Sequence, residues 1–196
     1  MLAQKNHSLD AILLTHEHND HIIGLDDIRP LFFRRKADMP VYGLKRVLDD
    51  VKVRFEYCFL DSPYPGVPRL ALNTITKDSS FSIAGLDIQP IEVMHGHLPI
   101  LGFRFDNLVY LTDAKYVSEE EIKKIAGCEI LIVNALHQHE HHSHFNLEES
   151  LAFVEKVQPQ RTFFIHMSHI MGKHETISQI LPKNIALAYD GLQIDF

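Results

Sequence analysis

The chain contains 196 residues, a length typical of one domain with a sizeable core. Its formal net charge of −7 disfavours binding to duplex nucleic acid, because the phosphate backbone carries charge of the same sign. No apolar run approaches the roughly 20 residues that span a bilayer, and no signal peptide is recognisable, so we expect a cytoplasmic protein without a membrane partner. Two cysteines are too few for a disulfide framework or a four-cysteine zinc site. The unusual feature of the composition is its 14 histidines.

The first third of the chain is predicted to contain two short strands and two helices. Residues 11–15 form a continuous apolar run, typical of a strand that is buried on both faces of an α/β sheet. Helical periodicity follows at 22–35, where Pro30 is expected to end or kink the helix. A strand at 41–43, a helix at 44–55 and a proline-rich loop at 60–68 are expected next.

From residue 71 to residue 112 the pattern changes to short β-strands that are bounded by turn residues. These strands are expected at 72–76, 80–83, 86–93, 101–105 and 108–112. Asp106 and Asn107 separate the last two of them and suit a hairpin turn.

The last part of the chain alternates between apolar strands and capped helices. Ser118 and Glu121 have the spacing of a capping box, and Asn146 is expected to cap a second helix. The expected strands lie at 129–136, 162–165, 185–188 and 192–196, and the expected helices at 118–127, 147–157 and 174–181. A meander followed by alternating strands and helices predicts an α/β fold, an αββα sandwich, in a single domain over residues 1–196.

A dense group of potential metal ligands follows the first predicted strand. Within six residues the chain places His16, His18, Asp20 and His21, in the pattern H-x-H-x-D-H. A buried strand holds its backbone rigidly, and the turn after it can direct several ligands at one point. A solvated turn that happens to contain histidines is the alternative, but the tight spacing favours a metal site. Imidazole makes zinc the default ion, and carboxylate oxygen also suits manganese.

Three further candidate ligands each directly follow an apolar run. These are His95, Asp113 and His166. Strands that run alike in a sheet place such residues at one edge, which is where α/β proteins carry their sites. Taken singly, each histidine would more often be a satisfied, partly buried residue, and the aspartate would more often be a helix or turn cap. Their common position at strand ends favours metal binding.

Together these residues resemble the metallo-β-lactamase-fold hydrolases, in which the H-x-H-x-D-H motif is followed by a single His, a single Asp and a final His. The resemblance runs from the first predicted strand to the last and implies a site for two divalent ions. It implies that His16, His18 and His95 hold the first ion, that Asp20, His21 and His166 hold the second, and that Asp113 bridges the two. Asp20 is thereby expected to serve in catalysis as well as in metal binding.

Two segments resemble a narrower group, the cyclic-phosphate phosphodiesterases related to the enzyme of the carbon–phosphorus lyase pathway. These segments are 24–30, directly after the motif, and 141–149. In that group the second histidine of an H-x-x-H element assists at the leaving group, a role that carries over to His144, with His141 as its substrate-side support. The residue after the first histidine is usually Pro in that group, whereas this chain has His142.

Arg29 and the remaining histidines have more ordinary alternatives. Arg29 is a candidate for substrate binding, because a guanidinium matches phosphate oxygens in a bidentate way, and a surface or ion-paired arginine is the alternative. His137 and His139 belong to a histidine-rich stretch, which is often an adventitious metal-binding tract or a solvated loop.

The resemblance implies hydrolysis of a cyclic or small phosphodiester, such as a cyclic nucleotide, by a hydroxide bound between two metal ions. His144, with a pKa near neutrality, is expected to protonate the leaving alkoxide. An ester hydrolase of the same fold, such as a lactonase or thioesterase, and a metal-binding protein without turnover are the alternatives. A nuclease that processes tRNA 3′ ends is disfavoured, because the chain is acidic and lacks an extended basic arm.

The start of the chain differs from that of the resembling hydrolases, which open with a strand–glycine-rich loop–strand segment. Residues 1–4 resemble the end of a helix, so we expect a fold that lacks its N-terminal strands. The sheet surface left uncovered would favour aggregation or dimerisation, and a homodimer is one way to cover it.

Overall fold

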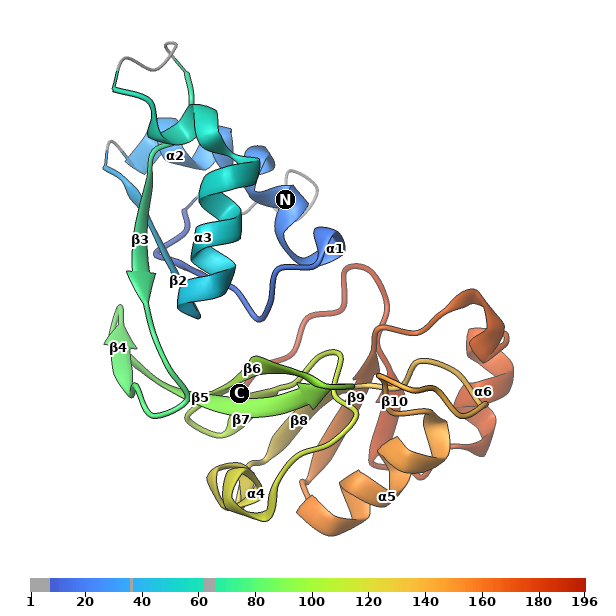
Figure 1. Cartoon of the computed structure of the whole chain (residues 1–196). Helices are drawn as coiled ribbons and strands as arrows, with labels where there is room; N and C mark the ends of the chain where they lie inside the picture. The colour runs from blue at the N-terminus through green and yellow to red at the C-terminus, as the bar shows by residue number, and fades with distance from the viewer. Residues whose placement is uncertain (1–7, 36, 62–65) are drawn as a thin grey trace. The chain divides into compact units, whose positions relative to one another are not determined.

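A computed structural model describes residues 8–35, 37–61 and 66–196 (Figure 1). The chain forms two compact units, the first made of residues 1–79 and 83–85 and the second of residues 80–82 and 86–196. Among the described residues, no helix combines the length and the apolar character that crossing a membrane requires. The helix end predicted at residues 1–4 lies outside the described residues, as does part of the loop predicted at 60–68.

The first unit is built on a parallel sheet of three strands, in the order β1-β2-β3. These are β1 (Ile12–Leu13), β2 (Met39–Gly43) and β3 (Leu70–Thr74). The strand predicted at 11–15 is therefore confirmed but shorter, and Leu14 extends its pairing by donating its N–H to Tyr42 O at 2.8 Å. Its predicted burial on both faces is wrong, because β1 is an edge strand of this sheet and its two residues are only partly buried.

The helical segments of this unit are α1 (Asn19–Ile22), η2 (Ile23–Ile28), α2 (Arg29–Arg35), α3 (Lys45–Arg54) and η3 (Glu56–Phe59). The single helix predicted at 22–35 is thus divided into three consecutive pieces. Pro30 was predicted to end or kink the helix, but it is instead the second residue of α2. In the first turn of a helix the missing N–H removes no hydrogen bond, and the fixed φ of proline suits the helix.

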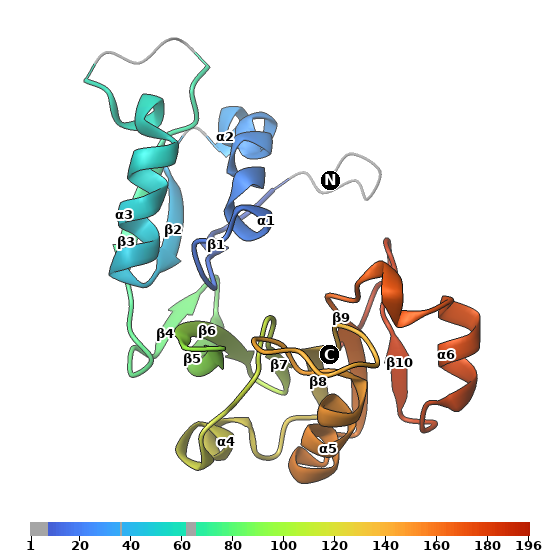
Figure 2. The ribbon, with the colours of Figure 1, turned by 45° about the vertical axis from the view of Figure 1, so that its right-hand side comes forward.

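A hydrophobic core of its own holds the first unit together. The amphipathic helix α3 lies against β2 and β3 (Figure 2) and buries Val47, Leu48 and Val51 on its inner face. These side chains share a cluster with the fully buried Met39 and Val41 of β2. Alternate burial along β2 follows from the period of a strand, whose successive side chains point to opposite faces.

The second unit is built on a sheet of seven strands, in the order β10-β9-β8-β7-β6-β5-β4. These are β4 (Phe81–Ile83), β5 (Leu86–His95), β6 (Leu98–Phe105), β7 (Leu108–Tyr110), β8 (Ile130–Asn134), β9 (Arg161–Ile165) and β10 (Ile185–Leu187). Strands β5 to β7 form an antiparallel meander, and β7 to β10 run parallel. The predicted hairpin turn is confirmed, because Phe105 pairs with Leu108 and Asp106 adopts a φ of 48°.

Two strand predictions are corrected by this topology. The strand predicted at 72–76 lies in β3, which pairs in parallel with β2 of the first unit instead of joining the meander. The segment 192–196 is not a strand, and β10 pairs in parallel with β9. Leu192 and Ile194 instead pack as partly buried residues on a small apolar cluster, whose buried members are Leu108, Ile130 and Phe163.

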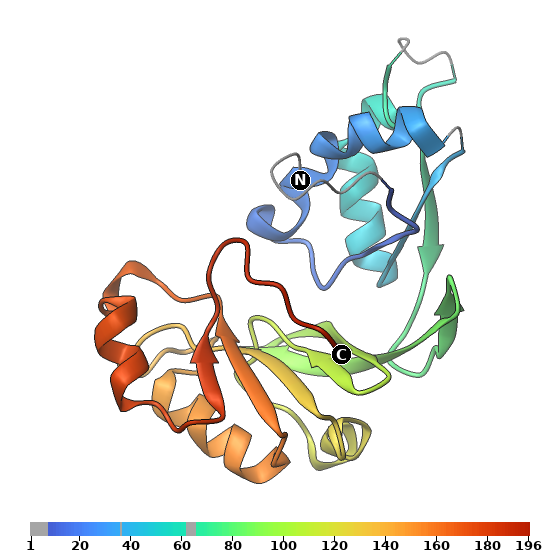
Figure 3. The ribbon, with the colours of Figure 1, turned by 180° about the vertical axis from the view of Figure 1, so that it is seen from behind.

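Helices α4 (Glu119–Ile125) and α5 (Leu147–Val157) lie on the same face of this sheet, as Figures 1 and 3 show from opposite sides. They bury Ile125, Phe153 and Val154 in one cluster with β-strand residues such as Val109 and Leu131. The unit also contains η4 (His169–Met171) and α6 (His174–Ile180). The α/β fold class is confirmed. That residues 1–196 form a single domain stays a prediction.

The two predicted helix caps differ in how completely they form. At α5 the Asn146 side chain accepts from Glu149 N at 2.8 Å, and the Glu149 carboxylate accepts from Asn146 N at 2.9 Å. At α4 the Ser118 hydroxyl accepts from Glu121 N at 3.2 Å, but the Glu121 carboxylate accepts from Glu92 N of β5 at 2.8 Å. The capping box predicted at Ser118 is therefore only half formed, because a sheet N–H takes the carboxylate.

Candidate active site

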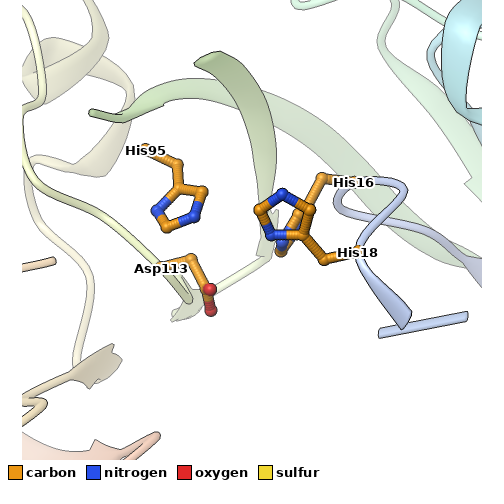
Figure 4. Close-up of side chains that lie close together, drawn as sticks. All are labelled: His16, His18, His95 and Asp113. Carbon is orange, nitrogen blue, oxygen red and sulfur yellow. The ribbon is translucent and has the colours of Figure 1, made fainter. Parts of the chain in front are cut away.

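The H-x-H-x-D-H motif occupies the extended segment after β1 and the first residues of α1. His16 is fully buried, and its Nδ1 atom lies 3.0 Å from Thr15 Oγ1. The His16 ring centroid lies 4.6 Å from that of His18 and 4.2 Å from that of His21. Figure 4 shows His16 and His18 as sticks on this segment. The structure therefore brings the three predicted imidazole ligands of the first unit together.

Asp20, like His18, is exposed. Its Oδ2 atom lies 3.3 Å from His21 Nε2, and His21 N donates to His18 O at 3.0 Å in the turn that begins α1. The next residue, Ile22, is 1% exposed and belongs to the core of the unit. A core side chain directly after the last motif residue anchors this short helix.

Two polar residues within the motif contact arginines of α3. Glu17 forms an ion pair with Arg46, and Asn19 accepts a hydrogen bond from Arg54. Both arginines lie on α3, about two turns apart. The motif is therefore tied to the one long helix described in this unit as well as to β1.

In the second unit, the predicted ligands stand at the ends of three different strands. His95 ends β5, Asp113 follows β7 and His166 follows β9. Asp113 and His166 both have left-handed backbone conformations, with φ of 55° and 54°. Non-glycine residues rarely adopt this conformation, and where they do they cluster at functional sites.

Asp113 is buried at the centre of this group. Its Oδ1 atom accepts from Thr112 Oγ1 at 2.6 Å and lies 3.3 Å from His166 Nε2. Its Oδ2 atom lies 3.8 Å from His144 Nδ1. Asp113, His144 and His166 each offer a ligand atom, and these atoms lie within 4.8 Å of one another. The carboxylate thus faces two imidazoles with its two oxygens.

His95 is fixed in orientation by the loop that carries His144. Its Nδ1 atom lies 2.9 Å from Ser143 O, a carbonyl that can only accept, so Nδ1 carries the proton and Nε2 is the acceptor nitrogen of the ring. Gly96 has a φ of 61°, and a Cβ there would meet Ser143 Cβ at 3.3 Å. The glycine therefore permits the close approach of the two loops. Figure 4 shows His95 together with Asp113.

The family of the chain follows from a match over most of its length. Residues 2–167 match the model of the β-lactamase superfamily domain. The chain belongs to this superfamily. The match includes the H-x-H-x-D-H motif and the strand ends at His95, Asp113 and His166, so the predicted resemblance to metallo-β-lactamase-fold hydrolases is confirmed.

Three other proteins are similar to this β-lactamase superfamily chain. A crystal structure described as a new diphosphatase from the PhnP family has a TM-score of 0.91 and 33% identity, covering 100% of this chain and 74% of that one. An octanoyltransferase of Porphyromonas gingivalis is 40% identical over 187 residues, 95% of this chain. The chain spans only 38% of the length of that relative. The short form of human tRNase Z, with a TM-score of 0.71 and 18% identity over 98% of this chain and 80% of its own, shares the fold.

His144 lies close to the candidate metal ligands of the second unit. Its ring centroid lies 4.5 Å from that of His95 and 5.1 Å from that of His166, on which it stacks. Burial lowers the pKa of His144 to about 4, and Asp113 opposes this shift. The predicted pKa near neutrality is therefore wrong for the protein alone, because a largely buried imidazole loses the hydration of its charged form.

The other histidines of the loop form a row that extends from His144. The His141 ring lies 5.0 Å from His144 and 5.7 Å from His137, and burial is the first cause that lowers the pKa of His141. His141 Nδ1 accepts from Ser143 N at 3.3 Å. His139 is exposed. His141 thus lies beside His144, where a residue that supports His144 would be expected.

Arg29 forms an ion pair at the surface, which was the alternative to a role in substrate binding. Its guanidinium donates to the Asp26 carboxylate at 2.7 and 3.0 Å, and Tyr57 donates to the same carboxylate. The two hydrogen bonds lower the pKa of Asp26, that from Tyr57 more than that from Arg29. Both side chains of the ion pair are about half exposed. The substrate-binding role of Arg29 stays a prediction.

Two residues that support the site were not predicted from the sequence. Asn134 ends the apolar strand β8, which is the same signal that identified the other strand-end residues. Ser143 acts through its backbone carbonyl, so its side-chain type gave no signal.

Proposed function

We propose that the chain is a metal-dependent hydrolase that cleaves small or cyclic phosphodiesters. The observation that carries this proposal is the position of His144, which stacks on His166, contacts Asp113 and follows the H-x-x-H pattern of the resembling phosphodiesterases. The 33% identity to a PhnP-family diphosphatase over the whole chain supports hydrolysis at phosphorus. A small soluble substrate, in preference to duplex nucleic acid, suits the net charge of −7.

The donor set fits divalent metal ions. Imidazole nitrogens and carboxylate oxygens are ligands for zinc and manganese alike. Asp113 Oδ1 and His166 Nε2 lie 3.3 Å apart, a separation that lets both atoms bind one ion. We propose that His16, His18 and His95 hold one ion, that Asp20, His21 and His166 hold the other, and that Asp113 bridges them. When bound, two such ions supply Lewis acidity and a hydrolytic nucleophile at neutral pH.

The side chains of this protein would then orient the reaction. Asp113 presents one oxygen toward His166 and one toward His144, and the Thr112 hydroxyl fixes the first. His144 holds the proton for the leaving oxygen when the phosphorus–oxygen bond breaks. A bound phosphate ester adds negative charge beside this ring, which favours the protonated imidazole that such a step requires.

Carbon-ester hydrolysis is the competing activity, because the metal ligands alone do not distinguish an ester from a phosphodiester. The octanoyltransferase relative makes a medium-chain acyl ester a suitable probe, although this chain corresponds to only 38% of that protein. The likeness to tRNase Z at 18% identity extends to the fold alone.

Four probes separate these activities when they are offered to protein loaded with Zn²⁺ or Mn²⁺. They are bis-(p-nitrophenyl) phosphate, 2′,3′-cyclic nucleotides, a nucleoside diphosphate and p-nitrophenyl octanoate. We expect hydrolysis of the first two, abolished by a chelator and restored by metal. Hydrolysis of the octanoate ester without any phosphate substrate would replace the proposal with an ester hydrolase. Tight metal binding with no turnover on any probe would indicate a binding protein.

A further inference from the structure

The strand β8 places one buried amide between two of the candidate ligands. Asn134 is its last residue and is fully buried. On one side β8 pairs with β7, whose continuation leads to Asp113. On the other side Asn134 itself pairs with Ile165, the residue before His166. Asn134 therefore lies at the same edge of the sheet as both ligands.

The Asn134 side chain makes a pair of hydrogen bonds to the backbone directly after Asp113. Its Oδ1 atom accepts from Ala114 N at 2.7 Å, and its Nδ2 atom donates to Ala114 O at 3.1 Å. Both hydrogen-bonding groups of one residue are thus satisfied by one side chain. An amide is the neutral side chain that can donate and accept in this way at the same time.

This pair of bonds fixes the backbone where it is strained. Asp113 has a φ of 55°, a conformation that is strained for a non-glycine residue and persists only when its surroundings determine it. Further along the same turn, Lys115 N and Tyr116 N both donate to Met94 O, next to His95. The backbone after Asp113 is therefore held from two sides.

The same clamp reaches the loop of His144. Ala114 O also accepts from Phe145 N at 2.6 Å, and Phe145 directly follows His144. The backbone of Asn134 is itself held, because Ser150 Oγ donates to Asn134 O at 2.8 Å. One buried residue therefore joins the backbone segments that carry Asp113 and His144.

We propose that Asn134 is a positioning residue that sets the Asp113 carboxylate through the Ala114 backbone. This inference rests on the proposed function for its consequence in metal binding, although the clamp itself is a property of the protein without metal. Residues that orient metal ligands from behind typically change metal affinity by 10–100-fold when they are replaced. We expect an effect of about that size on the binding of the two ions that Asp113 would bridge.

The test replaces Asn134 by residues that remove all or part of the clamp. Asn134→Leu keeps the approximate volume and removes both hydrogen bonds, whereas Asn134→Asp keeps the shape and the acceptor for Ala114 N. If the leucine variant fails to fold, the aspartate variant carries the test. Ser150→Ala is the matched control, because it removes a buried hydrogen bond to the Asn134 backbone and leaves the side-chain clamp intact.

Three readouts are measured. The first is hydrogen exchange of the Ala114 amide in metal-free protein, which we expect to accelerate in Asn134→Leu and to stay protected in Asn134→Asp and Ser150→Ala. The second is the affinity for Mn²⁺, expected to fall about 10–100-fold. The third is the spin-coupled electron paramagnetic resonance signal of two neighbouring Mn²⁺ ions, expected to disappear with the bridge.

These readouts distinguish the two proposals. A wild-type protein that binds fewer than two Mn²⁺ ions would contradict the proposed metal site, while accelerated Ala114 exchange would still support the clamp. A wild-type protein with two coupled ions would overturn the positioning role in either of two cases. The first is an Asn134→Leu variant that keeps both the coupling and the Ala114 protection, and the second is an Asn134→Asp variant that keeps the coupling. Equal losses in Ser150→Ala and the Asn134 variants would overturn it as well, because the effect would then be general to the core.

Discussion

The two units of the chain present their candidate ligands in opposite ways. In the first unit, His16, His18, Asp20 and His21 come from six consecutive residues, and one short helix with its preceding segment carries them all. In the second unit, His95, Asp113 and His166 come from three strand ends that are far apart in the sequence. The first group is dense in sequence, and the second exists only when the sheet is formed.

This difference shows where each unit must provide support. The local motif needs an anchor at each end, which the Leu14 pairing to β2 and the buried Ile22 supply. The strand-end group needs hydrogen bonds that hold separate loops together, and these come from Thr112, Asn134 and the Ser143 carbonyl. We therefore expect supporting residues to matter more in the second unit than in the first.

The largest expected effect is that of His144 in the second unit. His144→Ala should keep both metal ions and lower turnover of bis-(p-nitrophenyl) phosphate by on the order of 10²–10⁴, the range typical of a lost general acid. Metal content and kcat are measured on the same sample. His139→Ala, an exposed residue of the same loop, is the control and should behave as wild type. Loss of metal in His144→Ala would make this residue a ligand instead.

Helix capping gives a smaller effect that tests the support of the His144 loop. Asn146→Ala should lower the free energy of unfolding by about 1 kcal/mol, because both halves of its capping box are formed at the start of α5. Ser118→Ala at α4 should cost less, since only one hydrogen bond of its box is present. Urea unfolding of both variants measures the two costs. A greater cost at Ser118 would contradict the observed difference between the caps.

In the first unit, the ion pair of Arg29 is expected to contribute little to stability. Arg29→Ala should change the free energy of unfolding only slightly, because both side chains of the pair are about half exposed and solvent screens their charges. If Arg29 binds substrate as predicted, the same variant raises KM without changing metal content. An unchanged KM would leave Arg29 with its structural role alone. Arg69→Ala, which removes another exposed ion pair of this unit, that with Asp38, is the control.

The smallest effect is the titration of Tyr57, which donates to Asp26. Burial, followed by the hydrogen bond to Asp26, raises the pKa of Tyr57 from 10.0 to about 12. Because the folded protein holds this proton more tightly than the unfolded chain, the resulting stability is complete below about pH 10 and is lost as the pH rises toward about 12. Phenolate absorbance of wild type and Tyr57→Phe isolates this group. A pKa of Tyr57 near 10 in the folded protein would contradict the burial and the hydrogen bond.

Much of the architecture was predictable because hydrophobic periodicity is local. The capped helix at 147–157 was predicted at its observed bounds from Asn146 and its apolar spacing. Strand partners were less predictable, since pairing depends on distant segments, and β3 was wrongly assigned to the meander for this reason. The segment 192–196 has the alternation of a strand but packs as irregular chain on an apolar cluster.

The candidate site was predictable to the extent that its chemistry is carried by side-chain type. His16 to His21 and the strand-end residues are recognisable by the ligands they offer. The low pKa of His144 was not predictable, because it depends on burial that only the folded structure determines. The clamp of Asn134 on Ala114 was hidden for a similar reason, since an asparagine at a strand end has many uses.

The most direct test is to measure the metal content of a double-mutant cycle that removes one candidate ligand from each unit. It shows whether the ligands of the two units bind the same ions. We expect about two ions per chain in wild type, about one in His18→Ala, about one in His95→Ala and about one in the double variant, because ligands of the same ion are not additive. A double variant that loses both ions, or a wild type that binds none, would contradict a shared two-metal site.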